Sequence, residues 1–170
     1  MDVSAFYGIV SGLSFTLLGL WFVVADRHKD WFLVPVRRRM AYVVALHFML
    51  PGTMSVLSLV APEIPAVWRI VFALCGVAGV TGVVLIAQAL RDEYGRIRLA
   101  GITMAVALPI YIFVIVFALA PQASGFTGLQ PRQVEAILIA GIILLGLHAA
   151  WFLTTEPAPA AERKEATTEA

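Results

Sequence analysis

The sequence predicts an all-α integral membrane protein, a bundle of five transmembrane helices with its N-terminus outside and its C-terminus in the cytoplasm. The first observation is composition: 61% of the 170 residues are hydrophobic, whereas soluble domains contain roughly 45–50% apolar residues. The second is that these residues fall into five almost uncharged blocks, each long enough to cross a hydrocarbon core about 30 Å thick. The third is that Lys and Arg gather in alternate connections between the blocks. We therefore expect a single membrane domain over residues 1–155 and no soluble domain.

The five blocks give the predicted helices in order. The first block opens without Lys or Arg and shows no small-residue cleavage site, so we interpret it as a retained helix and not as a signal peptide. The helices are expected at about residues 5–25, 41–61, 67–90, 99–120 and 133–155. The segment 156–170 is rich in Pro, Ala, Glu and Thr, and we expect it to be a disordered cytoplasmic tail.

The distribution of basic residues predicts the orientation. Ten of the twelve Lys and Arg residues lie in the segments 26–40 and 91–98 and in the tail, which leaves only Arg69 and Arg132 on the other side. The positive-inside rule places the ten in the cytoplasm. Arg37, Arg38 and Arg39 form a cytoplasmic basic cluster, which we interpret first as a topology signal, with a site that faces anionic lipid head groups as the alternative. The excess of Arg over Lys, with abundant Ala, Val and Gly, is typical of a bacterium, and hence of a cytoplasmic membrane.

Small residues at helical spacing predict where helices approach closely. The first helix contains Gly8 and Gly12 in the segment "GIVSG", and the third contains Gly76, Gly79 and Gly82. Small side chains on one stripe let a second backbone come near in lipid. We expect this packing within the chain, with a homo-oligomer or a membrane-complex partner as the alternative.

Two prolines predict kinks inside helices. Pro51 has no N–H, so the carbonyl of His47, four residues earlier, loses its helical partner. Because an unpaired carbonyl is costly in lipid, we interpret His47 first as a polar companion of this kink. Pro109 predicts a similar kink in the fourth helix.

The histidines also permit a second hypothesis. His47 and His148 are predicted to lie at similar depths, about 9 Å below the cytoplasmic interface. Two imidazoles at one depth could ligate a haem iron axially, bind a metal ion or relay protons. Two histidines share a depth often by chance, so we predict no cofactor and keep haem or metal binding as an alternative. Cys75 is the only cysteine, which excludes an internal disulfide and a Cys-based metal site.

Other polar side chains near the membrane have structural explanations. Glu135 lies in the first turn of the fifth helix, where the helix dipole favours a carboxylate. Arg69 is expected to pair with Glu63 or Glu135, or to extend to water. We find no acidic residue at the midplane of a predicted helix, which disfavours an ion-coupled transporter.

The sequence identifies no enzyme class, since it contains no HExxH, GxSxG or GxGxxG motif. In length and helix number the chain resembles the tryptophan-rich sensory proteins, but it lacks the Trp- and Pro-rich loops expected of them, and no ligand chemistry is carried over. We predict a small multi-pass protein of a bacterial cytoplasmic membrane, a non-catalytic accessory or packing subunit whose partner is the lipid bilayer and not a nucleic acid. The alternatives are the protomer of a small transporter or channel, and a bis-histidine redox protein that binds haem or a metal.

Overall fold

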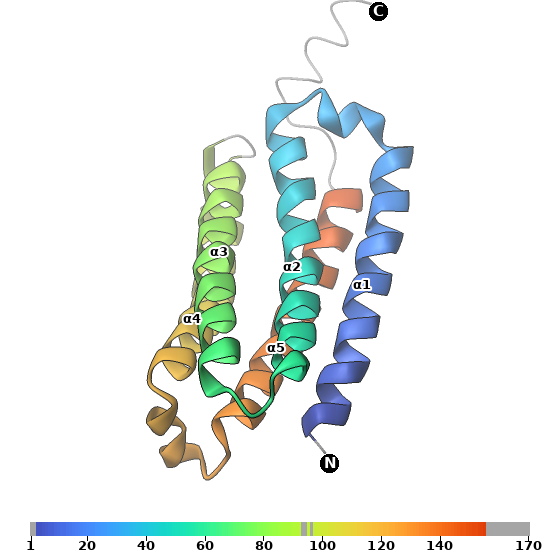
Figure 1. The fold of residues 1–170 in the computed structure, drawn as a ribbon. Helices are drawn as coiled ribbons and strands as arrows, with labels where there is room; N and C mark the ends of the chain where they lie inside the picture. Colours follow the sequence, from blue (N-terminus) through green and yellow to red (C-terminus); the bar gives the residue numbers. More distant parts are fainter. Residues whose placement is uncertain (1–2, 93–94, 96, 156–170) are drawn as a thin grey trace, which may run out of the picture.

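A computed structural model describes residues 3–92, 95 and 97–155 of the chain (Figure 1). These residues form five long helices, each long and apolar enough to cross a membrane, as the sequence predicted. The predicted disordered tail at 156–170 lies outside the described residues. The helices are α1 (Val3–Arg27), α2 (Pro35–Val60), α3 (Pro65–Asp92), α4 (Ile97–Leu119) and α5 (Pro131–Thr155), and two short 3₁₀ helices, η1 (Lys29–Phe32) and η2 (Pro121–Thr127), lie in the connections.

Three of the helices begin at a proline, and this sets their bounds. The fixed φ of proline suits the first helical turn, where its missing N–H has no partner to lose. For α2, Val34 is extended, with φ −102° and ψ 114°, and Pro35 follows as the first helical residue. The helix therefore starts six residues before the predicted residue 41.

The longer α2 changes the environment of the predicted basic cluster. Arg37, Arg38 and Arg39 lie in the first turns of this helix and not in a loop. Arg37 is buried, with 8% of its surface exposed, whereas Arg38 and Arg39 face outward. The added helical turns thus direct Arg37 into the protein, whereas contact of the cluster with anionic lipid head groups stays a prediction.

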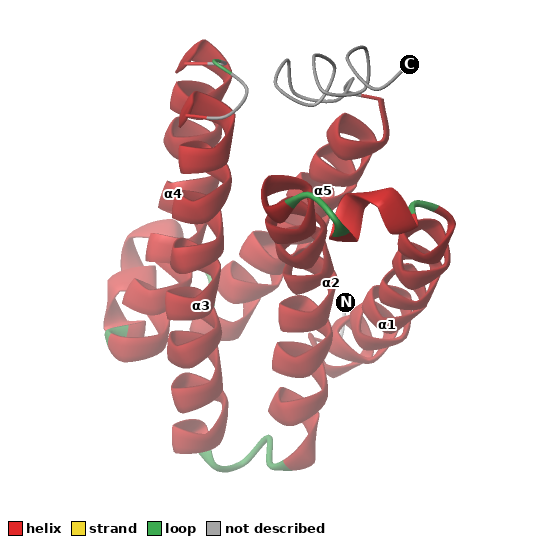
Figure 2. Ribbon diagram, turned by 90° about the horizontal axis from the view of Figure 1, so that it is seen from above, coloured by secondary structure: helices red, strands yellow, loops and turns green. Residues whose placement is uncertain are grey.

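The helix α2 lies at the centre of the bundle. Seen from one end, α3 and α4 lie together on one side, α1 lies on the other, and α2 and α5 lie between them (Figure 2). α2 packs against α1, α3 and α5, and α5 also contacts α4 and α1. In the most apolar part of α2, 61% of the residues are buried, the largest share of the five helices.

Glycines bring α3 close to its neighbours. A Cβ on Gly79 would overlap the ring of Tyr111 in α4, and a Cβ on Gly76 would lie 2.5 Å from Cγ1 of Ile115. Gly82 similarly faces Val43 of α2, whose Cγ1 would lie 3.2 Å from an added Cβ. The stripe at Gly76, Gly79 and Gly82 thus permits the contacts of α3 with both α4 and α2.

The glycine stripe of α1 is different. A Cβ on Gly8 or Gly12 would meet no atom within 4 Å, and both residues are exposed on the outer face of the helix. These two glycines therefore make no close approach within the chain. Their role in packing between chains stays a prediction.

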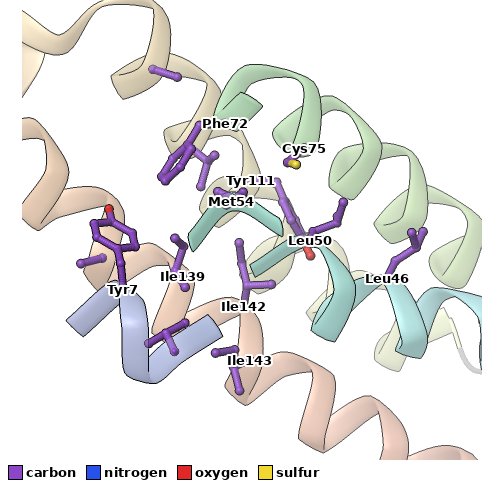
Figure 3. Close-up of a cluster of buried hydrophobic side chains, with 14 of the residues drawn as sticks. Tyr7, Leu46, Leu50, Met54, Phe72, Cys75, Tyr111, Ile139, Ile142 and Ile143 are labelled. Atoms are coloured by element: carbon purple, nitrogen blue, oxygen red, sulfur yellow. The ribbon is translucent and has the colours of Figure 1, made fainter. Parts of the chain in front are cut away.

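Apolar side chains fill the bundle in two clusters. One contains Tyr7, Met54, Phe72 and Tyr111 (Figure 3) and lies mostly toward the end of the bundle where α1 begins. The other lies toward the opposite end and includes Trp31 of η1, which is only 2% exposed. The connection after α1 therefore folds back onto the helices.

Candidate functional site

An apolar cavity of about 480 Å³ lies between α2, α3, α4 and α5. It lies in the half of the bundle toward the start of α2 and the end of α5. Among its lining side chains only His47, Thr103 and His148 carry polar atoms, and the remainder are aliphatic or aromatic apart from Gly141. Concave, mostly apolar sites with a few polar groups are typical of small-molecule binding.

The cavity brings together the two histidines that the sequence singled out. His47 reaches it from α2 and His148 from α5. The levels of the two residues can be compared through Gly146, where an added Cβ would lie 2.8 Å from Cβ of His47. His148 follows Gly146 by two residues, or about 3 Å along the helix axis. The two imidazoles are thus borne by packed helices at nearby levels.

Each imidazole has one nitrogen engaged by its own helix. Nδ1 of His47 lies 2.8 Å from the carbonyl oxygen of Val43, and Nδ1 of His148 lies 2.8 Å from that of Leu144. A carbonyl oxygen only accepts hydrogen bonds, so Nδ1 is the nitrogen that carries the proton. In the neutral imidazole, Nε2 then keeps its lone pair. In that neutral form, both side chains present an acceptor or metal-ligating nitrogen and not a donor.

The surroundings of the two rings differ. His47 is 4% exposed, and its ring packs edge-on against Tyr111, with centroids 5.8 Å apart and planes at 76°. His148 is exposed in the isolated chain. His47 therefore forms part of the packed wall of the cavity, whereas His148 lies where a ligand or lipid can reach it.

Tyr111 is a residue of this region that the sequence analysis did not find. Its ring lies against Gly79 of α3, and its hydroxyl is directed toward α2 (Figure 3). The hydroxyl oxygen is buried and has no hydrogen-bond partner among the described residues. No local pattern marks this residue, because its position depends on which helix packs against the α3 glycines.

The two prolines lie inside helices that continue past them. Pro51 is within α2 and Pro109 within α4, so the predicted kinks stay a prediction.

Arg69 of α3 contacts the end of α4. Its guanidinium donates to the carbonyl oxygens of Ala118 and Leu119, at 2.8 and 2.7 Å. It pairs with neither Glu63 nor Glu135 within the described residues, because the end of α4 offers unpaired carbonyls close by.

The comparisons with known proteins add no family. The chain matches no protein-family model, and neither a curated protein nor a solved structure shows significant similarity to it.

Proposed function

We propose that this protein is a non-catalytic, multi-pass protein of a bacterial cytoplasmic membrane that binds an apolar ligand in the cavity between α2, α3, α4 and α5. The observation that carries the proposal is the cavity itself, about 480 Å³ in volume and lined almost wholly by apolar side chains. Apolar surface that stays unfilled loses dispersion contacts on one side. A hydrocarbon chain or ring system would restore them.

The ligand's polar group can be inferred from the histidines. Because Nδ1 of each ring donates to a backbone carbonyl, each neutral imidazole offers only the lone pair of Nε2. A ligand that carries a hydroxyl can donate to this nitrogen, whereas a ligand with only carbonyl groups cannot be held in this way. We therefore infer a predominantly apolar ligand with at least one hydrogen-bond donor.

The orientation supports access from the cytoplasmic leaflet. Arg38 and Arg39 of α2 and Arg91 of α3 lie at the end of the bundle nearer the cavity, and the positive-inside rule assigns basic ends to the cytoplasm. With the N-terminus outside, the cavity lies in the inner half of the membrane. An apolar ligand would then enter from the inner leaflet.

Native mass spectrometry of the full chain, released from mild detergent, tests the proposal with two variants of α5. Ala149→Phe places a ring in the cavity, because Ala149 is one of its lining residues. Ala140→Phe adds the same ring on the outer face of the helix and serves as the control. We expect the wild type and Ala140→Phe to carry an adduct of constant mass and Ala149→Phe to lack it. A bare monomer in all three samples would contradict the proposal.

The histidine pair favours bis-histidine haem binding as a second candidate function. Two neutral imidazoles with free Nε2 atoms line one cavity, and axial histidines ligate haem iron through such a nitrogen. The purified protein would then show a Soret band that shifts on reduction. His47→Ala and His148→Ala should each change this band, whereas His28→Ala, which removes a ring stacked on Trp31 at the end of the bundle, should not. Protein without visible absorption after expression with added haem would refute this candidate.

A further inference from the structure

The cavity has a mouth between α4 and α5 that opens toward the lipid. Ile102 and Val106 of α4 line the cavity, and they are also 60% and 49% exposed on the surface of the chain. Leu144 of α5 lines it and is 56% exposed, and His148, one turn farther along α5, is exposed as well. These four side chains belong both to the cavity and to the outer surface of two membrane-spanning helices. The cavity is therefore open sideways to the hydrocarbon of the membrane.

The register of α4 and α5 makes these residues the two edges of one opening. The helices run in opposite directions (Figure 1), and an added Cβ on Gly141 would lie 3.6 Å from Cδ1 of Ile110. From this contact toward the start of α4, Val106 lies about 6 Å away along α4 and Leu144 about 4.5 Å away along α5. The second residue of each edge follows one turn later, at about 12 and 10.5 Å. Each edge residue of α4 thus has an edge residue of α5 at nearly the same level.

The wall opposite the mouth is closed and holds one polar side chain. It is formed by side chains of α2 and α3 that are only 1–7% exposed: Met40, Val44, His47, Val83, Ile86 and Leu90. Nδ1 of His47 is engaged by the carbonyl oxygen of Val43, and Nε2 has no hydrogen-bond partner among the described residues. In the neutral imidazole this nitrogen is an acceptor. An unsatisfied acceptor therefore lies on the side of the cavity away from the lipid.

The lining restricts the polar group that can reach this acceptor. Among the described residues that line the cavity, none is Lys, Arg, Asp or Glu, so a phosphate or an ammonium group would be buried without a counter-charge, which is costly. A hydrocarbon chain against this wall would leave Nε2 of His47 without a hydrogen bond, which is also unfavourable. Carbonyl and ether oxygens only accept hydrogen bonds, so they cannot pair with it. A hydroxyl group is neutral and can donate the missing bond.

We propose that the cavity takes a neutral lipid with a free hydroxyl group, which enters head first between α4 and α5 and donates its hydroxyl to Nε2 of His47. This inference rests on the proposed function and specifies its ligand as a lipid alcohol or a lipid phenol. Entry is head first because the acceptor lies opposite the mouth. The tail then stays between the apolar edges of the mouth and continues into the bilayer. The charged head groups of phospholipids do not suit the site, so it distinguishes a neutral lipid from the bulk of the membrane.

The test compares a hydroxyl lipid with its own methyl ether. Hexadecanol and hexadecyl methyl ether differ in the hydroxyl donor, and para-dodecylphenol and its methyl ether form the same pair for a phenol. Each compound is titrated onto the full chain in mild detergent, and the unfolding temperature is measured, because a ligand that binds only the folded state raises it. We expect half-saturation by the alcohol or the phenol at a concentration at least about fivefold lower than by the matching ether. The pair with the larger difference identifies the class of hydroxyl.

Two histidine variants and a labelling experiment locate the hydroxyl. His47→Leu should abolish the advantage of the hydroxyl compound over its ether, whereas His148→Leu, at the mouth, should retain it. A hexadecanol with a photoreactive diazirine at the end of its tail keeps the test valid if His47→Leu does not fold. In the wild type, head-first binding predicts labelling of α4 or α5 at or outside the mouth, and not of α2 or α3 at the closed wall.

Three results would overturn the proposal. The first is a wild type that binds neither hydroxyl compound more tightly than its ether. The second is an advantage of the hydroxyl that persists in His47→Leu. The third is labelling of α2 or α3 by the tail of the photoreactive alcohol. The adduct that Ala149→Phe is expected to lack can still be present in each of these cases, so this proposal can fail while the proposed function stands.

Discussion

The contact between Gly79 and Tyr111 makes a sharp prediction about the stability of the bundle. In Gly79→Ala the new methyl group would overlap the aromatic ring, and the ring has little room to retreat because Tyr111 is 1% exposed and packs against His47. Overpacking of this kind costs about 1–3 kcal/mol. Replacement of a helical glycine by alanine also gains roughly 1 kcal/mol of helix propensity. We therefore expect a net destabilisation of about 0–2 kcal/mol.

The matched control separates the two contributions. Gly12→Ala makes the same chemical change inside a helix, at a position where an added Cβ meets no atom within 4 Å. Gly12→Ala should gain helix propensity without any overpacking. The free energy of unfolding of Gly79→Ala should therefore lie about 1–3 kcal/mol below that of Gly12→Ala. Titration with SDS in mixed micelles, followed by far-UV circular dichroism, measures both values.

A double-mutant cycle tests the cause of the difference. If the methyl group meets the Tyr111 ring, Gly79→Ala should cost much less in a Tyr111→Ala background, since the two positions are in direct contact. Equal stability of Gly79→Ala and Gly12→Ala in the otherwise unchanged protein would refute the close approach of α3 and α4.

Three further predictions concern other contacts. Gly146→Ala should destabilise the protein by about 0–2 kcal/mol after the gain in helix propensity, because its Cβ would lie 2.8 Å from that of His47. Gly141→Ala should be tolerated, because the nearest atom to its added Cβ, Cδ1 of Ile110, is 3.6 Å away; the same titration measures both. Trp21→Phe should lower the free energy of unfolding by about 1 kcal/mol, because it removes the hydrogen bond from Nε1 to the carbonyl oxygen of Ala41 at 3.0 Å; an unchanged midpoint would contradict this role. Arg69→Gln should lower the free energy of unfolding by about 1–3 kcal/mol, because it removes the hydrogen bonds to the carbonyl oxygens of Ala118 and Leu119. Glu63→Gln should be as stable as the wild type. An equal loss of stability in both variants would instead support the Arg69–Glu63 ion pair that the sequence suggested.

The helices were predictable because a bilayer requires long apolar segments. All five exist near their expected positions, and the largest shift is at α2, which begins at Pro35. That shift arises because the uncharged block that predicts the helix begins only after Arg37, Arg38 and Arg39, whereas the helix itself includes them. The burial of Trp31 was also not predicted, because it depends on a contact with Trp21, whose ring centroid is 5.9 Å away, and no local pattern encodes such a contact.

The candidate sites were only partly accessible from sequence. His47 and His148 could be chosen because polar side chains in apolar helices are few. The cavity that they share could not be found, since it depends on how α3 and α4 sit against α2 and α5. Glu135 was assigned to the helix dipole, an explanation that needs only its place in α5. Its complete burial follows from three helices meeting, which lies beyond any one-helix pattern.

The central position of α2 has a consequence for how the protein is made. α2 has the lowest mean hydropathy of the five helices and the largest buried share, and it carries His47, Ser55 and Ser58 into the interior. During synthesis it leaves the ribosome before α3 and α5, the helices that cover most of these groups. The helix with the lowest mean hydropathy must therefore enter the bilayer before α3 and α5 can pack against it. The fifth helix then completes the burial of the second, so a chain truncated before α5 should insert poorly and be degraded.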